Sequence, residues 1–111
     1  MQNSLFEWDD KKNRSNYKKH GIRFETAARV FDDPYYIIWH DVDHSGYNKY
    51  GVWEDRYIVL GYVADILCVV YTVREYGDKE IIRIISARPA EGIEIDDYIN
   101  SRGDVNEKNG K

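Results

Sequence analysis

The pattern that most constrains this fold lies in the second half of the chain, where four short segments are rich in β-branched and aromatic residues. Polar or glycine-containing stretches separate these segments, which span residues 35–40, 56–62, 66–73 and 80–87. Such residues favour strands. The links 63–65 and 75–79 are short enough for hairpins, so we expect at least the last three strands to form an antiparallel meander.

The first third of the chain has a helical pattern instead. Asp9 or Asp10 can cap a helix over residues 11–20, and Gly21 is suited to end it in the left-handed conformation. Apolar residues then recur at the spacing of one helix face, at Phe24, Ala27, Ala28 and Phe31. This second helix should end before Pro34. The sequence therefore predicts an α+β fold in which two N-terminal helices precede a four-stranded, mainly antiparallel sheet.

The 111 residues are enough for one domain, which we place at residues 1–101. Residues 41–54 form the one long loop, and such loops are often functional or mobile. A short C-terminal helix is predicted over residues 90–101, weakened by Gly92. Residues 102–111 are predicted to be a polar, flexible tail.

Two features indicate the cellular setting. The apolar runs are far shorter than the roughly 20 residues of a membrane helix, and residues 1–10 lack the basic start and apolar run of a secretion signal. A cytoplasmic protein is expected. The single cysteine, Cys68, lies in an apolar run and is interpreted as a small core residue, since no basic neighbour in sequence would activate a thiolate.

Charge is unevenly distributed along the chain. The net charge of −4 argues against a protein that coats nucleic acid indiscriminately. Residues 11–29, however, hold seven basic side chains against the single acid Glu25, whereas residues 30–65 hold seven acids against Lys49 and Arg56. The molecule should be bipolar if the fold keeps these segments apart.

Short blocks in a fixed order carry a family resemblance. They include Phe6, Glu7, Trp8 and Asp9; Lys12 and Asn16; Lys19, His20 and Gly21; Phe24, Glu25 and Ala27; Val30, Phe31, Asp33 and Pro34; Asp43, His44 and Ser45; Glu54, Asp55 and Arg56; Gly61; Thr72 and Arg74; and the run from Ile82 to Arg88. In this order the blocks resemble the BrnT family of type II toxins, whose fold is similar to that of RelE-type ribonucleases.

The resemblance implies a ribonuclease that arrests growth and is neutralised by a BrnA-like antitoxin that also binds operator DNA. We expect it to need no cofactor, because the sequence shows no credible set of metal ligands. The sequence departs from the family in two places. Residues 46–53 enlarge the loop before Glu54, and the segment after Arg88, commonly a basic helix in the family, carries Glu91, Glu94, Asp96 and Asp97 instead.

Metal-independent RNA cleavage requires a group that stabilises the phosphorane, and arginine is suited to it because its fork pairs with two phosphate oxygens. Arg56, Arg74, Arg83 and Arg88 lie on predicted strands or strand ends. Arg83 and Arg88 are separated by an odd number of residues, so they share a face only if the strand ends or bulges near Ser86. We therefore rank Arg74 and Arg83 above Arg88, which is assigned to RNA binding.

Candidate acids and bases come from the same region. Glu54 lies two residues before Arg56, so the pair can act as base and phosphate clamp or form an ordinary ion pair. His44 lies in the long loop and is predicted to be catalytic. His20, at a helix end, can cap carbonyls or contact RNA.

Two further alternatives remain open. His40, Asp41, Asp43 and His44 could bind a metal, although their spacing matches no metal motif and no metal site is assigned. The basic helix, with Lys12, Lys18, Lys19 and His20, can grip RNA or dock an acidic antitoxin. Three functions compete: a metal-independent endoribonuclease, which we favour, a non-enzymatic partner-binding module in a repressor complex, and a metal-dependent nuclease.

Overall fold

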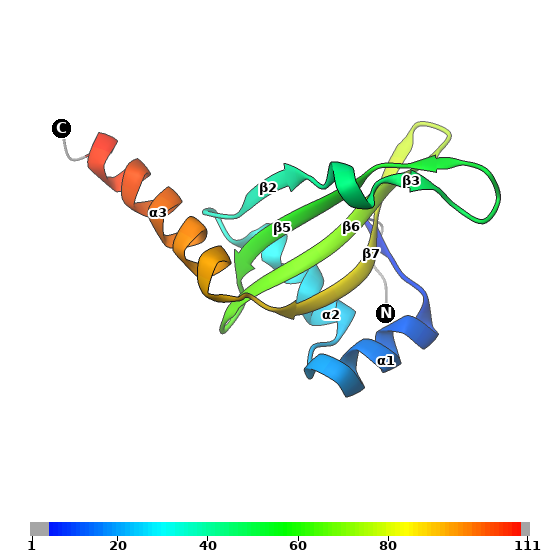
Figure 1. The fold of residues 1–111 in the computed structure, drawn as a ribbon, viewed down its shortest axis with the longest axis horizontal. Coiled ribbons are helices and arrows are strands. Elements are labelled where there is room, and N and C mark those ends of the chain that lie inside the picture. The colour runs from blue at the N-terminus through cyan, green and yellow to red at the C-terminus, as the bar shows by residue number, and fades with distance from the viewer. Residues whose placement is uncertain (1–4, 110–111) are drawn as a thin grey trace.

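A computed structural model describes residues 5–109, with side chains described as far as Arg102. Its centre is a five-stranded sheet of order β1-β7-β6-β5-β2 (Figure 1). Strands β2 (Ile37–His40), β5 (Arg56–Tyr62), β6 (Ile66–Tyr76) and β7 (Lys79–Pro89) pair antiparallel. The predicted meander of the last three strands is therefore confirmed, with β2 added beside β5.

The prediction of four strands was incomplete. A two-residue strand, β1 (Phe6–Glu7), pairs parallel with β7, and the predicted loop 41–54 contains the 3-10 turn η2 (Val42–His44) and a small hairpin of β3 (Gly46–Tyr47) and β4 (Trp53–Glu54). Strands β1, β3 and β4 are each too short to give an alternating apolar pattern in the sequence. Strands β6 and β7 also extend beyond the predicted limits, because their hairpin continues to the turn at Gly77.

Helix α1 (Asp10–His20) follows the prediction closely. The Asp9 carboxylate accepts from the Lys12 N–H, and Gly21 ends the helix with a φ of 74°. The second helix was predicted too simply, because α2 (Phe24–Ala27) tightens into the 3-10 helix η1 (Ala28–Asp32). Its predicted apolar face is nevertheless buried at Phe24 and Ala27.

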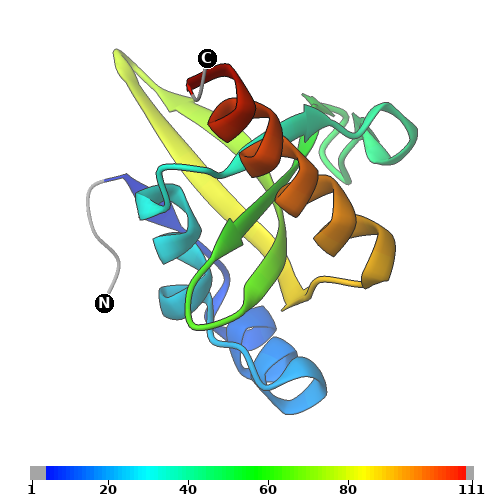
Figure 2. The same cartoon turned by 90° about the vertical axis from the view of Figure 1, so that its left-hand side faces the viewer.

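Helix α3 (Gly92–Asn109) is longer than the predicted short helix and enters the segment 102–111 that was predicted to be a tail; residues 110–111 lie outside the described part. The helix crosses one end of the sheet, as the turned view shows (Figure 2). Tyr98 of α3 is buried and donates a hydrogen bond to Asp33. None of the helices in the described part is long and apolar enough to span a membrane.

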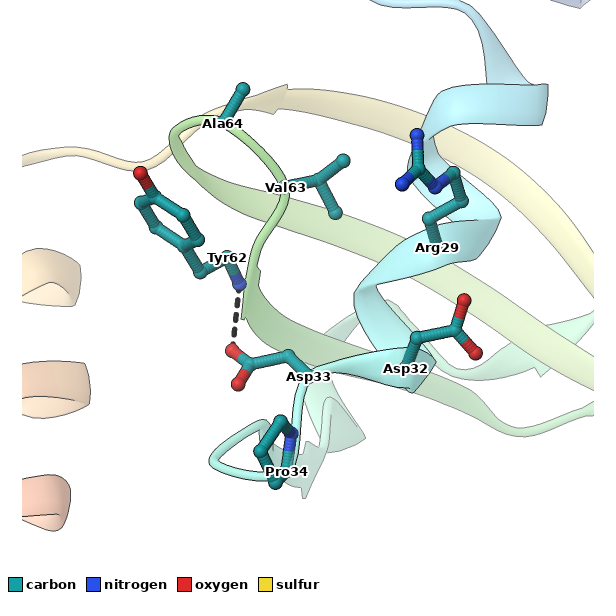
Figure 3. Close-up of a pocket in the computed structure, with 7 residues that line it drawn as sticks. All are labelled: Arg29, Asp32, Asp33, Pro34, Tyr62, Val63 and Ala64. Atoms are coloured by element: carbon teal, nitrogen blue, oxygen red, sulfur yellow. Dashed lines mark hydrogen bonds between the residues drawn. The ribbon is translucent and has the colours of Figure 1, made fainter.

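Asp33 connects three segments at this end of the molecule. Its carboxylate also accepts from the backbone N–H groups of Tyr62, at 2.8 Å, and Tyr35, at 2.9 Å. The first of these bonds lies beside an open pocket of about 400 Å³ between η1 and the turn from β5 to β6 (Figure 3). Asp33 thus ties η1 to both β5 and α3.

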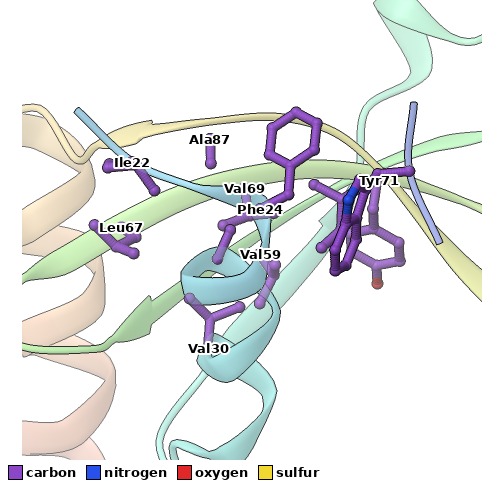
Figure 4. Packing of buried hydrophobic residues seen from close by; sticks show 11 residues of the cluster. Ile22, Phe24, Val30, Val59, Leu67, Val69, Tyr71 and Ala87 are labelled. Atoms are coloured by element: carbon purple, nitrogen blue, oxygen red, sulfur yellow. The ribbon is translucent and has the colours of Figure 1, made fainter. Parts of the chain in front are cut away.

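Strand alternation divides the buried residues between the two faces of the sheet. On one face Val59, Leu67, Val69, Tyr71, Ile84 and Ala87 pack against Trp8, Ile22, Phe24, Ala27 and Val30 (Figure 4). On the other face Leu60 and Cys68 pack against Tyr98. Because α3 covers only this end of the second face, the rest of that face can carry polar side chains.

Candidate functional site

A bulge in β7 places all four sheet arginines on one face. Val70 pairs with Ser86 but Tyr71 pairs with Ile84, so Ile85 is an extra residue. The bulge reverses the alternation between Arg83 and Arg88, which satisfies the condition set by the sequence. Arg56 and Arg83 both lie opposite Thr72, and Arg88 lies opposite Cys68. We call this side, away from α2, the arginine face.

Three of these four arginines are already held by carboxylates. The shortest N–O distances are 2.6 Å from Arg74 to Glu54, 2.8 Å from Arg83 to Glu7 and 2.8 Å from Arg88 to Glu94. The exception is Arg56, whose guanidinium makes neither an ion pair nor a hydrogen bond with any side chain in the described part of the chain. It is half-buried and therefore positioned by the sheet.

Arg56 opens onto a pocket of about 290 Å³ in the arginine face. The polar or titratable side chains that line it are Asp41, His44, Arg56, Cys68, Ser86 and Arg88. His44 belongs to η2, and its Nδ1 lies 2.8 Å from Oδ2 of Asp41. The ring is otherwise exposed, so Nε2 is open to a bound molecule. A cation and an imidazole thus share one pocket.

Comparison with protein families places the chain as a whole. The family model described as "Ribonuclease toxin, BrnT, of type II toxin-antitoxin system" matches residues 8–94. The chain belongs to the BrnT family. No individual curated protein matches it. The matched region contains η2, the arginine face and the first turn of α3.

The BrnT-family chain places Glu54 apart from the pocket that holds Arg56 and His44. Glu54 lines a second hollow with Arg74, between the β3–β4 hairpin and β6, and accepts from Arg74 and from the Asn48 side chain at 3.2 Å. The enlarged loop therefore forms a wall beside this ion pair. The structure joins Glu54 to Arg74 and does not join it to the Arg56 side chain.

Arg88 is held by the acidic segment that departs from the BrnT pattern. Its two terminal nitrogens donate to the two carboxylate oxygens of Glu94, each at 2.8 Å, and Glu91 lies 3.4 Å away. The hydrogen bond with Arg88 holds the pKa of Glu94 below its usual range, although burial opposes this. Glu94 thus occupies the fork of an arginine at the rim of the pocket.

The four residues considered as metal ligands do not converge on one point. The His40 ring lies tilted against Tyr57 with ring centroids 5.2 Å apart, and its Nε2 lies 3.1 Å from Asp55, whereas His44 and Asp41 contact each other. No three metal-ligating side chains converge anywhere in residues 5–102. The geometry assigns no metal ligands to this region.

Of the residues predicted to contact RNA, Arg88 lies on β7, and the others lie on α1, beside the edge of β7. The buried Asn16 side chain binds Ala87 on that edge, with Nδ2 donating to its carbonyl at 2.8 Å and Oδ1 accepting from its N–H at 3.1 Å. Lys12, Lys18 and Lys19 are exposed and His20 is half-buried. Of these lysines, none forms an ion pair with a described carboxylate.

Cys68 lines the pocket as a neutral group. Its side chain is almost fully buried, and burial raises the pKa of the thiol to about 12. It is therefore protonated near neutral pH and packs as a small apolar residue, as predicted. A nucleophilic thiolate has no support here.

The sequence analysis named His44 and Arg56 as candidates but gave no such role to Asp41 or Ser86. Asp41 was considered only as a metal ligand, because the sequence does not show which carboxylate faces which imidazole. Ser86 was noted only as the place where a bulge would matter. A spacing of three residues between Asp41 and His44 is the one signal that could have suggested their contact.

Proposed function

We propose that this BrnT-family chain is a metal-independent endoribonuclease whose reaction takes place in the pocket of Arg56 and His44. One observation carries the proposal: the Arg56 guanidinium, which has no ion-pair partner among the described residues, shares a pocket with an imidazole whose Nε2 is open. An uncompensated cation on a rigid strand is suited to bind a phosphate.

The proposed reaction is attack of the ribose 2′-hydroxyl on the adjacent phosphate. His44 accepts the proton of that hydroxyl through Nε2, while Arg56 pairs with two oxygens of the crowded phosphorane. As the O2′–P bond forms, the bond between phosphorus and the 5′-oxygen of the next nucleotide breaks, which leaves a 2′,3′-cyclic phosphate. The leaving 5′-oxygen takes its proton from water, and His44 releases its own proton to solvent. We assign the base to His44 because the carboxylate of Glu54 is already bound to Arg74 in another hollow. Neither step of this scheme needs a metal or an organic cofactor.

The remaining arginines and the basic helix are proposed to hold flanking phosphates. Arg74 and Arg83 lie on the same face as Arg56, and Arg88 lies at the pocket. Helix α1 lies beside the edge of β7, and its Lys12, Lys18, Lys19 and His20 are proposed to contact the RNA backbone.

The partner is proposed to be a BrnA-like antitoxin, with operator DNA contacted only through that protein. Family membership supports an antitoxin in general terms. An acidic antitoxin segment could use the unpaired lysines of α1, so the same surface remains open to RNA or to the partner. Cytoplasmic RNA would be the target, and free toxin should arrest growth until the antitoxin is co-expressed.

The proposal is tested by incubating purified protein with total bacterial RNA in EDTA. We expect cleavage to persist, and Arg56→Ala to reduce its rate by about 10² to 10³-fold with the fold retained. Arg56→Lys should restore little, since it lacks the bidentate fork. Arg29→Ala is the matched control, because Arg29 is exposed beside a pocket away from the arginine face.

Three results would change the assignment. Intact RNA and normal growth at verified soluble expression would favour the non-enzymatic binding module. Activity that EDTA abolishes and a single divalent metal restores would indicate a metal-dependent nuclease. If Glu54→Gln removes activity and His44→Ala does not, the base is Glu54.

A further inference from the structure

We propose that Asp41 is a positioning residue which fixes the tautomer of His44, and that Ser45 holds Asp41 and Arg56 in one rigid unit. The inference rests on the proposed function for its catalytic consequence. Its structural part, the control of one imidazole by one carboxylate, can be tested without RNA.

The contact between Asp41 and His44 is short and unequally exposed. The Nδ1–Oδ2 distance is 2.8 Å, and the side chain of Asp41 is 15% exposed against 74% for His44. A carboxylate cannot donate, so the hydrogen must be on Nδ1 whenever the ring is neutral. The lone pair is then on Nε2, the nitrogen that the proposed reaction needs as proton acceptor.

A closed set of hydrogen bonds attaches Asp41 to the backbone of Arg56. The Asp41 N–H donates to the Arg56 carbonyl, the Arg56 N–H donates to Oγ of Ser45, and that hydroxyl donates to the Asp41 carbonyl, each at 2.8 Å. The turn that carries the imidazole is therefore fixed to the strand that carries the guanidinium. Ser45 positions both groups although it touches neither side chain.

The Asp41 carboxylate has no other structural duty in the described residues. It makes no cap hydrogen bond to the turn η2, and the one hydrogen bond that its carboxylate makes with a described residue is with His44. Asp43 offers a matched comparison, since it lies in the same turn, is exposed and has no hydrogen bond or ion pair with a described residue. Loss of either carboxylate removes one negative charge next to the pocket.

The experiment compares Asp41→Asn with Asp43→Asn. The first readout is the ¹⁵N chemical shifts of the His44 ring at a pH where it is neutral, which report the tautomer directly. An asparagine can donate as well as accept, so Asp41→Asn should convert a single Nδ1–H form into a mixture, as expected for an amide facing an imidazole. Asp43→Asn should leave the tautomer unchanged.

The second readout is cleavage of a labelled oligoribonucleotide. Asp41→Asn should lower kcat by about 10- to 100-fold with little change in KM, whereas Asp43→Asn should match the parent protein. Ser45→Thr should retain activity because the threonine hydroxyl can replace both of the bonds that the Ser45 hydroxyl makes to Asp41 and Arg56, and Ser45→Ala should lose it. Circular dichroism verifies that each variant is folded.

An unchanged His44 tautomer in folded Asp41→Asn overturns the proposal, and so does an equal loss of kcat in Asp43→Asn. If the tautomer changes but kcat does not, then Asp41 positions a ring that the reaction does not use, and the catalytic part of the inference fails. If the parent protein leaves RNA intact, the proposed function fails while the tautomer comparison still decides the role of Asp41.

Discussion

Asn16 is the buried polar residue that joins helix α1 to the sheet. Its amide group makes three hydrogen bonds, to the carbonyls of Ile22 and Ala87 and from the Ala87 N–H, with donor–acceptor distances between 2.8 and 3.1 Å. All three partners are backbone groups that would otherwise be unsatisfied in a buried position. The residue therefore contributes more to stability than its size suggests.

We expect Asn16→Ala to lower the free energy of unfolding by roughly 3 kcal/mol, because it leaves several buried backbone groups without partners. Urea denaturation followed by circular dichroism measures the change. Ser15→Ala is the control, since Ser15 is exposed on the same helix and should change little. Equal stabilities of the two variants would show that water replaces the Asn16 amide.

At this scale the sequence predicted residue types better than residue partners. His44 and Arg56 were identified because imidazole and guanidinium have few alternatives in phosphate chemistry. The partner of each arginine was not predictable, since Glu7, Glu54 and Glu94 are 76, 20 and 6 residues away from theirs. Such pairings depend on strand register and on where α3 turns back.

The elements that the sequence predicted are those with a repeated pattern. Helix α1 has a cap at each end, and β5 and β6 are long runs rich in β-branched and aromatic residues. The bulge at Ile85 was foreseen only as a condition, because one inserted residue leaves no periodic signal of its own. Yet this bulge decides that Arg83 and Arg88 share a face.

Helix η1 packs closely against β5 because residue 61 is glycine and has no Cβ atom. A Cβ atom on Gly61 would lie 2.7 Å from Cβ of Val30 and 2.9 Å from its carbonyl oxygen. We expect Gly61→Ala to destabilise the protein by about 2 kcal/mol through overpacking. Thermal unfolding tests this, with Gly46→Ala as control because nothing lies within 4 Å of its Cβ position. Equal melting temperatures would mean that η1 moves away freely.

Helix α3 is expected to restrain RNA binding through its acidic first turn. Glu94→Gln removes the carboxylate that occupies the Arg88 fork, so affinity for a labelled, non-cleavable oligonucleotide should rise by about 3- to 10-fold. Asp97→Asn is the control, since it removes the same charge from an exposed position of α3 whose side chain makes no hydrogen bond or ion pair with a described residue.

Fluorescence anisotropy compares the RNA affinities of the two variants. An equal rise in both would indicate a long-range charge effect, and a fall in Glu94→Gln alone would mean that Glu94 positions Arg88.

Across the whole molecule, several carboxylates are stabilised in their charged form by the fold. For Asp33, burial raises the pKa, but hydrogen bonds from Tyr98, Tyr35 and Tyr62 outweigh this and hold it below its usual value. The pKa of Glu25 is lowered by the Asn13 side chain, and that of Glu94 by Arg88. Each depressed pKa stabilises the folded state above the unfolded-state value and loses that contribution as the pH falls through the folded-state value.

Stability to urea should therefore be nearly constant from pH 7 to about pH 5 and fall below about pH 4, where unfolded carboxyl groups take up protons. Asp33→Asn should be less stable than the parent protein at neutral pH, by about 2 kcal/mol, and approach it at pH 3. Asp32→Asn is the control at an exposed neighbouring position. A difference for Asp33→Asn that does not change with pH would show that its hydrogen bonds, not its charge, are what matter.

The amide of Asn16 also protects a strand edge from pairing with another copy of the protein. A strand with free N–H and C=O groups is a template on which a strand of another copy can add. At Ala87 both outward-facing groups are already bound by one side chain, so an incoming strand finds no partner there. Truncating Asn16 would therefore expose a strand edge, and the resulting protein should self-associate as its concentration rises.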